Sequence, residues 1–325
     1  MAIYKFYNVQ LLPIEHQTVN EVGSEGYCRL FEAMNTQIHE NREKRLKFSS
    51  IAAPMKGGMF FAPFSVSFYE YPDDNGYRKI IYGSFLKFDN VNELVDTNSG
   101  ETEYRSQGNT SSKRFDLEFV FDPYTHTLAI HKTKGLPTRN PLISALEEIL
   151  NVYAVDIFKS HSLVIEELTS ADSVEDFFQS PKKGYKHYEG HVTFSNSDSF
   201  DNVIEKKIIQ QAEEELKYNN IARWNSEYKS FPKSLMKDLP MQAKIQMILA
   251  TKYGNAEVLY MDENGKSQKY QMEDYPVQES LKETRNMNHR ERAILIKDMI
   301  LKAIKKTKMK DIITQKNKKI LDNED

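Results

Sequence analysis

The sequence contains one cysteine, Cys28, and no long apolar run. A single cysteine excludes an intrachain disulfide and a cysteine-based structural zinc site. The longest unbroken apolar stretch, Met59–Phe64, has about six residues, whereas a membrane-spanning helix needs about 20. The amino terminus also lacks the positively charged segment and the apolar core of a secretion signal. We therefore expect a soluble, cytoplasmic protein without a membrane span.

The common catalytic motifs are also missing. The sequence has no Gly-x-x-x-x-Gly-Lys-Ser/Thr phosphate loop, no Gly-x-Gly-x-x-Gly turn and no Gly-x-Ser-x-Gly nucleophile elbow. It therefore predicts no catalytic residue and no cofactor, and it favours a non-enzymatic protein over an enzyme.

The chain is nevertheless long and apolar enough to fold into real cores. It has 325 residues, of which 39% are hydrophobic and 11% aromatic. A chain of this length is enough for two domains of ordinary size. We therefore expect a globular protein and look for a boundary between two parts.

The first part, residues 1–180, mixes strand and helix patterns. Apolar residues at helical spacing predict one helix around Tyr27–Ile38 and another from Asn140 to Tyr153. The polar span 96–114 is expected to be a long loop. Alternating patterns predict strands near residues 4–11, 64–71, 78–88, 115–121, 128–130 and 161–168. This order predicts an α+β domain with an antiparallel or mixed sheet.

The second part, residues 181–325, is predicted to be a mainly helical domain. Pro181–Gly184 marks the expected boundary. Helices are expected from Ser199 or Asp201 to Leu216 and from Met241 to Lys252. A hairpin at 256–272 follows, because Asp262–Lys266 is a strong turn signal. A basic helix over 284–310 ends the domain.

Charge is distributed unevenly along the chain. The segment Leu281–Lys319 carries 13 Lys and Arg residues against 4 Asp and Glu residues, a net charge of +9. The whole chain carries only −3, so the preceding body is acidic. Such asymmetry indicates a polyanionic or membrane partner.

Within this segment, apolar residues form one stripe of a helix. Ile296, Met299, Ile300, Ala303 and Ile304 cover about 140° of its circumference, and cations occupy the remainder. A cationic helix of this kind fits the phosphate backbone of DNA or RNA. It also fits a solvated surface helix, an anionic membrane or an acidic protein partner. The residues predicted to contact phosphates are Arg285, Arg290, Arg292, Lys297, Lys302, Lys305 and Lys306.

The sequence contains one pair of histidines that could suggest a metal site. His187 and His191 have the spacing of helical zinc ligands, but Gly184 and Gly190 argue against a helix, so no metal site is expected there.

Two Glu-x-Lys patterns have the composition of a metal-dependent nuclease site. They are Glu215 with Lys217 and Glu227 with Lys229, and both are interpreted as helical, whereas a nuclease would place the pair on a strand. Arg285 and His289 are too close for the motif of helical ribonucleases.

Several strand patterns resemble a bacterial family of unknown function. They are the segments Tyr7–Pro13, Ile81–Phe88, Phe119–Pro123 with Leu128, Ala256–Lys266 and Asp274–Pro276. That family occurs in mobile-element and phage-defence loci, and its carboxyl half is distantly similar in plan to the phage lambda exclusion protein RexA. The resemblance implies a cytoplasmic, homodimeric, DNA-binding component of an abortive-infection system. It also implies a separate effector that is often membrane-bound.

The leading hypothesis is therefore a non-enzymatic, sequence-tolerant DNA-binding or RNA-binding sensor or regulator of anti-phage defence. Two alternatives stay open. One is a divergent metal-dependent nuclease or ribonuclease toxin, and the other is a protein-interaction module that binds no nucleic acid.

Overall fold

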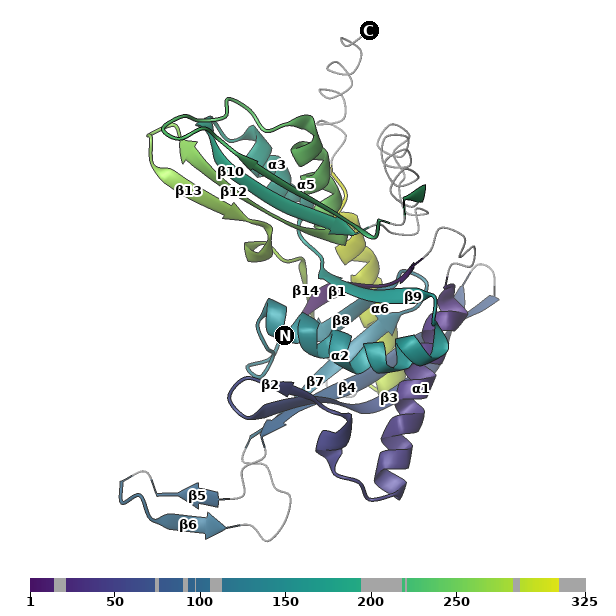
Figure 1. Cartoon of the computed structure of the whole chain (residues 1–325). Helices are drawn as coiled ribbons and strands as arrows, with labels where there is room; N and C mark the ends of the chain where they lie inside the picture. Colours follow the sequence, from purple (N-terminus) through teal and green to yellow (C-terminus); the bar gives the residue numbers. More distant parts are fainter. Residues whose placement is uncertain are drawn as a thin grey trace.

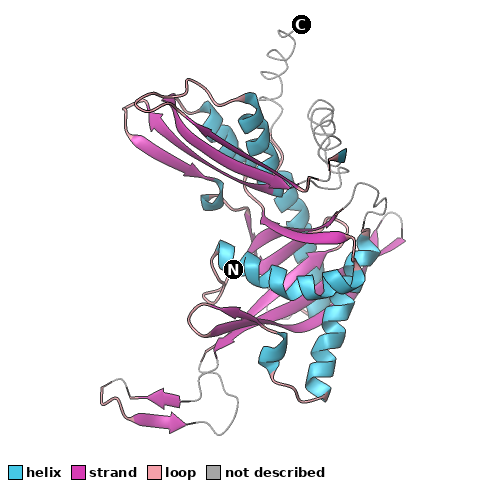
Figure 2. Cartoon of the chain, viewed as in Figure 1, coloured by secondary structure: helices cyan, strands magenta, loops and turns pink. Residues whose placement is uncertain are grey.

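An eight-stranded antiparallel sheet forms the centre of the molecule, and its strand order is β14-β1-β8-β7-β4-β3-β2 with β9 paired to β1. The computed structural model describes residues 1–14, 22–73, 76–89, 93–96, 98–105, 113–193, 218, 219, 221–282 and 287–309. The strands of this first sheet are β1 (Ala2–Pro13), β2 (Ala53–Met55), β3 (Met59–Asp73), β4 (Gly76–Asp89), β7 (Arg114–Asp122), β8 (Thr127–His131), β9 (His161–Glu167) and β14 (Gln278–Leu281). Figures 1 and 2 show that the sheet is curled.

Strand β1 organises this sheet because it pairs along both of its edges. One edge binds β8, and the other binds β14 at its start and β9 further on. The pairing with β14 places Ala2 opposite Leu281, so segments far apart in the sequence become neighbours. Any element that follows β14 is therefore held close to the centre of the sheet.

Helices cover both faces of the first sheet. The helices α1 (Ser24–Glu43) and α2 (Arg139–Ile157) pack on one face, where Phe31, Phe119 and Leu146 are fully buried. On the other face lies α6 (His289–Lys306), which buries Ile296 and Ile300 against Phe6 and Val120. A short 3-10 helix, Phe48–Ile51, follows α1. In Figure 1 the two faces are seen as α1 and α2 before the sheet and the yellow α6 behind it.

The second sheet has four antiparallel strands in the order β11-β10-β12-β13, and helices cover only one of its faces. Tyr188 and Val258 point from the strands into a core with Met247 of α5. The opposite face is open in the part of the chain that is described. The elements are α3 (Ala171–Gln179), β10 (Lys182–Thr193), β11 (Arg223–Lys229), α5 (Met241–Tyr253), β12 (Gly254–Asp262), β13 (Ser267–Gln271) and the 3-10 turn Met272–Asp274.

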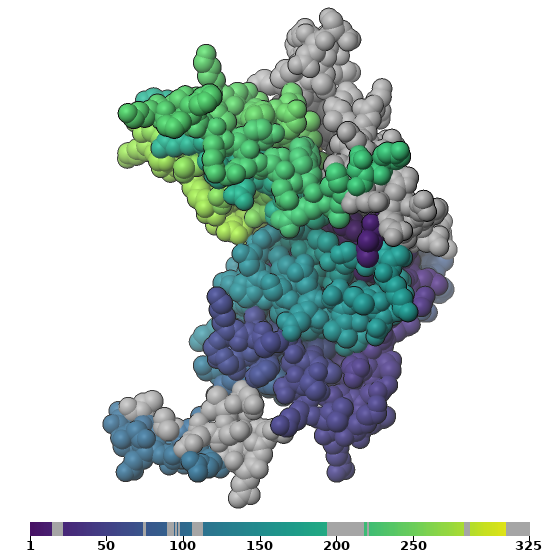
Figure 3. All heavy atoms as spheres, viewed as in Figure 1, coloured from purple at the N-terminus to yellow at the C-terminus, as the bar shows by residue number. Residues whose placement is uncertain are grey.

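Short polar contacts join the two lobes, the first lobe being the first sheet with α1, α2 and α6, and the second lobe being the second sheet with α3 and α5. The amide of Thr169 donates to the carbonyl of Thr251, and the Thr251 hydroxyl donates to the carbonyl of Thr307, just beyond α6. Figure 3 shows the two lobes in contact, with an indentation between them on one side, and this junction is called the waist below. Helix α6 therefore starts on the first sheet and ends against the second lobe.

The predicted α+β class is confirmed, and so are both helices and all six strands expected before residue 180. The span 96–114 differs from the expected loop, because β5 (Glu93–Val95) pairs with β6 (Thr102–Arg105) in a small hairpin. That hairpin projects away from the body of the molecule (Figure 1). Its alternation is too short and too polar to be recognised in the sequence.

The part after residue 181 contains more strand than the sequence indicated. Strand β10 begins at Lys182, inside the expected boundary, and two register shifts disturb its alternation. At Gly190 a Cβ atom would lie 2.4 Å from the Tyr188 hydroxyl, so glycine permits close packing within the strand. Helix α5 and the hairpin β12–β13 match their predictions. The helix expected from Ser199 or Asp201 to Leu216 lies outside the described residues.

The described helices contain no segment that is both long and apolar enough to cross a membrane.

Candidate functional site

Helix α6 carries most of the residues that were predicted to contact phosphates, and a strong local signal starts it. The side chain of Asn288 accepts from the amide of Glu291 at 2.9 Å, and Glu291 in turn accepts from the amide of Asn288 at 3.2 Å. This reciprocal capping box satisfies two amides that the first turn would leave unpaired. The cap fixes where the helix begins and therefore which side chains face the sheet.

The apolar stripe predicted for this helix is its buried face. Ala293, Ile296, Ile300 and Ala303 are fully buried, and Met299 is almost so. Because apolar area is removed from water along the whole stripe, the helix is held on the sheet by the hydrophobic effect. The rotation of α6 about its axis is thereby set, and so is the side to which each cation points.

Arg292 does not point to solvent but closes a buried ionic cluster on the sheet. Its Nε lies 2.5 Å from Oε1 of Glu118, and its Nη2 lies 2.9 Å from Oε2 of the same carboxylate. Two tyrosines complete the cluster: the Tyr4 hydroxyl donates to Oε2 at 2.5 Å and the Tyr82 hydroxyl donates to Oε1 at 2.7 Å. Arg292 and Glu118 expose only 18% and 15% of their side chains. Arg292 is therefore a docking residue of α6.

The environment of this cluster keeps its ions charged. Burial alone would raise the pKa of Glu118, but hydrogen bonds from Arg292, Tyr4 and Tyr82 outweigh it and hold that pKa below its ordinary value. The hydrogen bond to Glu118 raises the pKa of Arg292. Burial, followed by the nearby carboxylate, raises the pKa of Tyr4. A fixed charge pair with both tyrosines protonated is a structural contact, because no group in it is poised to exchange a proton near neutral pH.

Three further cations of α6 also bind to the protein itself. Arg290 donates to the backbone carbonyl of Glu70 at 2.9 Å. Lys297 lies 4.6 Å from the centre of the Tyr71 ring and 3.0 Å from Asp298. Lys306 forms an ion pair of 2.6 Å with Glu279 of β14, yet about half of its side chain stays exposed.

Lys302 and Lys305 differ from these residues. Both are exposed, and the ammonium group of neither makes a hydrogen bond or ion pair with the described residues. Together with the half-exposed Lys306 they occupy positions i, i+3 and i+4, which lie on one side of a helix. Arg285, the remaining predicted contact, lies outside the described residues. The name "outer lysines" is used below for Lys302, Lys305 and Lys306.

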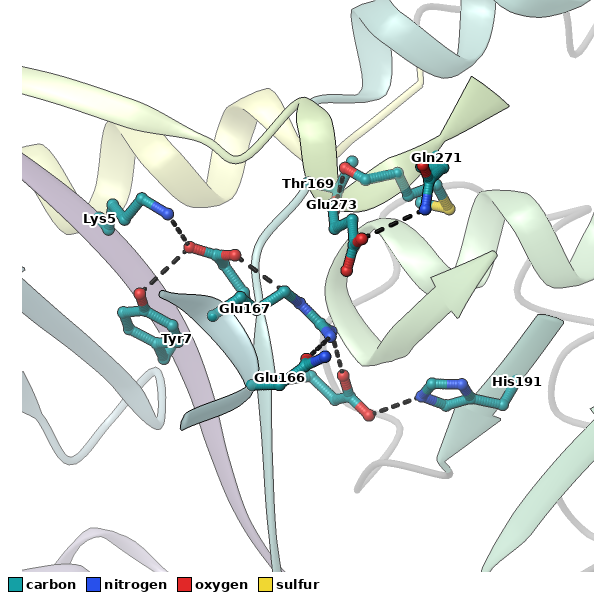
Figure 4. Close-up of polar contacts among 11 residues, drawn as sticks. Lys5, Tyr7, Glu166, Glu167, Thr169, His191, Gln271 and Glu273 are labelled. Atoms are coloured by element: carbon teal, nitrogen blue, oxygen red, sulfur yellow. Dashed lines mark hydrogen bonds and ion pairs between the residues drawn. The ribbon is translucent and has the colours of Figure 1, made fainter. Parts of the chain in front are cut away.

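A second charged cluster lies at the waist between the lobes (Figure 4). Glu167 binds Lys5 at 2.8 Å, while Arg139 binds Glu166 at 3.0 Å. Glu166 also binds His191 of β10 at 2.8 Å, which links the first lobe to the second. Sequence reasoning missed this cluster because its members come from β1, α2, β9 and β10 and share no local motif.

The two histidines that have metal-ligand spacing are separated in the structure. His191 binds Glu166, as described above, whereas His187 lies 2.9 Å from Oε1 of Glu227. His187, Glu189 and Glu227 each offer one ligand atom, and the three atoms lie within 4.8 Å of one another. The third member of this group comes from β11, 40 residues along the chain from His187.

The interpretation of Glu227 and Lys229 as helical is wrong, because both lie on the strand β11. Alternate residues of a strand share one face, so the two side chains point to the same side, and their charged atoms are 2.5 Å apart. Glu189 lies directly opposite Glu227 on the neighbouring strand. Glu215 and Lys217 lie outside the described residues.

A pocket of about 450 Å³ opens on this face of the second sheet. Its lining is polar and includes Glu189, His191, Arg223, Asn225, Glu227 and Glu257. These residues come from β10, β11 and β12, so the pocket lies on the uncovered side of the sheet. It offers carboxylate, imidazole, amide and guanidinium groups to a polar ligand.

One comparison with known proteins identifies a family. The model of the family described as "Domain of unknown function (DUF4747)" matches residues 5–302. A search of curated proteins gave no match. The family match spans nearly the whole chain, from β1 to the last turns of α6. The chain therefore belongs to the DUF4747 family.

Proposed function

We propose that this member of the DUF4747 family is a non-enzymatic, sequence-tolerant nucleic-acid-binding protein whose outer lysines contact the phosphate backbone. The observation that carries the proposal is the exposure of Lys302 and Lys305 on a helix whose other side is fixed to the sheet. Neutralising phosphates with lysines releases condensed counterions, and this needs no sequence code. DNA is the proposed ligand, and RNA is the comparison that the experiment includes.

The position of the outer lysines supports this proposal energetically. Like charges at i, i+3 and i+4 destabilise a helix by about 0.2–0.5 kcal/mol per pair. Lys305 and Lys306 lie in the last turn, where cations interact favourably with the helix dipole, but Lys302 lies a turn earlier. A polyanion would relieve the repulsion that Lys302 experiences from Lys305 and Lys306.

The biological role that we propose rests on the strand patterns that resemble a bacterial family found in phage-defence loci. In this role the protein is a cytoplasmic homodimer that senses or regulates abortive infection and acts with a separate effector, which is often membrane-bound. Expression of the wild type should protect bacteria against phage. Replacement of the outer lysines should abolish that protection if nucleic-acid binding is the required step.

The direct test is a binding series with duplex DNA, single-stranded DNA and duplex RNA at several salt concentrations. The wild type should bind with a logarithmic affinity that falls linearly with the logarithm of salt concentration. The triple variant Lys302→Gln, Lys305→Gln, Lys306→Gln should bind at least about tenfold more weakly at low salt. Equal affinity of the two proteins would overturn the proposal.

A metal-dependent nuclease is a second candidate, and one observation favours it. Glu227 and Lys229 lie on a strand with Glu189 opposite, an arrangement that can hold a divalent cation beside a lysine. Incubation of the pure protein with nucleic acid and Mg²⁺ or Mn²⁺ decides between the candidates. Cleavage that Glu189→Gln abolishes would replace the binding-only proposal, and intact nucleic acid would exclude the nuclease.

A further inference from the structure

The open face of the second sheet brings three glutamates into one row across three strands. Glu227 of β11 lies opposite Glu189 of β10, and Glu189 in turn lies opposite Glu257 of β12. Like charges directly opposite each other destabilise a sheet. A row of this kind therefore needs cations to balance it.

The two outer glutamates of the row have cationic partners, whereas the central one has none among the described residues. Glu227 is paired with Lys229 at 2.5 Å, and Glu257 is paired with Lys269 at 2.9 Å. Glu189 is exposed, and its carboxylate makes no hydrogen bond or ion pair with the described residues. The least compensated carboxylate thus lies in the middle of the row.

His187 places an imidazole ring beside these carboxylates. It lies two residues before Glu189 on β10, so both side chains emerge on the same face of the sheet. Its Nε2 is 2.9 Å from Oε1 of Glu227, and hydrogen bonds from Lys229 and then His187 lower the pKa of Glu227. His187 and Glu189 of β10 and Glu227 of β11 therefore form a triangle of possible metal-ligand atoms, and the pairing of the two strands fixes its geometry.

We propose that His187, Glu189 and Glu227 bind a divalent transition-metal ion. One imidazole nitrogen and two carboxylate oxygens are ligands suited to Zn²⁺ or Mn²⁺. Glu189 and Glu227 also line the polar pocket of about 450 Å³. The coordination positions of the ion that these three side chains do not fill therefore face that pocket. The site takes an ion together with water or a small anionic ligand.

This site is independent of the proposed nucleic-acid contact, because none of its residues lies on α6. Loss of DNA binding in the triple lysine variant would leave metal binding unchanged. Failure of metal binding would likewise leave the role of the outer lysines untouched.

Calorimetric titration of the metal-free protein with ZnCl₂ and MnCl₂ tests the site. The wild type should bind one ion in a saturable manner, and His187→Gln or Glu189→Gln should weaken that binding about tenfold or more. The matched control is Glu257→Gln, which removes the same charge from the same pocket but lies outside the triad. An equal loss in Glu257→Gln, or unchanged binding in the two triad variants, would overturn the proposal.

Two further measurements keep the test decisive. Lys229→Ala removes the ammonium group that competes for Glu227, so it should tighten metal binding about threefold or more, a change of about 0.7 kcal/mol or more. Co²⁺ in place of Zn²⁺ should give a visible absorption spectrum that His187→Gln alters. An unchanged affinity of Lys229→Ala, or a spectrum indifferent to His187, would contradict direct coordination by this triad.

Discussion

The two halves of α6 carry cations at similar density but use them differently. In the first half Arg290, Arg292 and Lys297 all bind groups of the protein itself. In the second half Lys302 and Lys305 are exposed and bind none of the described residues. The first half thus fixes the helix to the sheet, and the second half leaves charge available for a partner.

The difference shows why charge counted along a sequence overstates charge on a surface. In the sequence Arg292 lies in the same basic segment as the lysines. Its carboxylate partner, Glu118, is 174 residues away in the sequence, and only the register of β7 in the sheet brings the two together. The cations of α6 are therefore divided between contacts within the protein and a smaller exposed surface.

The largest expected effect comes from breaking the docking contact of the first half. Arg292→Ala should lower the free energy of unfolding by about 3 kcal/mol, because it leaves the Glu118 carboxylate desolvated without its cation. Urea denaturation at pH 7 measures this change. A loss below about 0.5 kcal/mol would show that Arg292 is a surface residue like the outer lysines.

The carboxylate partner should give a smaller, pH-dependent effect. Glu118→Gln should cost about 2 kcal/mol at pH 7, since a charged acceptor becomes neutral. The folded pKa of Glu118 lies below its unfolded value of about 4.3, so its carboxylate stabilises the protein above that value and less as pH falls through the folded pKa. Wild type and variant should therefore converge in acid, and a constant difference from pH 7 to pH 3 would contradict this assignment.

Lys306 is intermediate between the two halves of α6, because it is paired with Glu279 but stays half-exposed. Glu279→Gln should release Lys306 and strengthen DNA binding about two- to fivefold, because an exposed ion pair is worth about 0.2–1 kcal/mol. Fluorescence anisotropy with labelled duplex DNA at low salt measures the gain. Weaker binding of this variant would place Glu279 in the interface instead of beside it.

The smallest effect is expected at Lys297. Its contact with the Tyr71 ring is partly exposed and should contribute about 0.5–1 kcal/mol to folding. Lys297→Met keeps the apolar stem, so it should lose little stability and no DNA affinity. A clear loss of DNA affinity would extend the binding surface into the first half of α6.

Local patterns made part of this structure predictable. The stripe Ile296–Ile304 and the turn Asp262–Lys266 determine α6 and the hairpin β12–β13, because each depends on neighbours in the sequence. Strand β10 was missed because two register shifts disturb its alternation. Strand β11 is a half-buried edge strand, so only Trp224, Ser226 and Tyr228 show its inner face.

The candidate sites were less predictable than the fold. The helix and its apolar side were expected, but the partners of Arg292 and Lys306 lie on β7 and β14 and depend on how the chain returns to the sheet. The group His187, Glu189 and Glu227 likewise depends on the pairing of β10 with β11. Contacts of this kind are set by tertiary register, which no short motif in this sequence records.

The most direct test of the central claim is the salt dependence of DNA binding in two matched triple variants. One replaces the outer lysines by Gln, and the other replaces the exposed Lys183, Lys237 and Lys266 of the second lobe. Each phosphate contact contributes about 0.9 to the slope of log affinity against log salt concentration. We predict that the first variant lowers the slope by about 2–3 and that the second leaves it unchanged. Equal slopes in both variants and the wild type would contradict the assignment of nucleic-acid binding to the second half of α6.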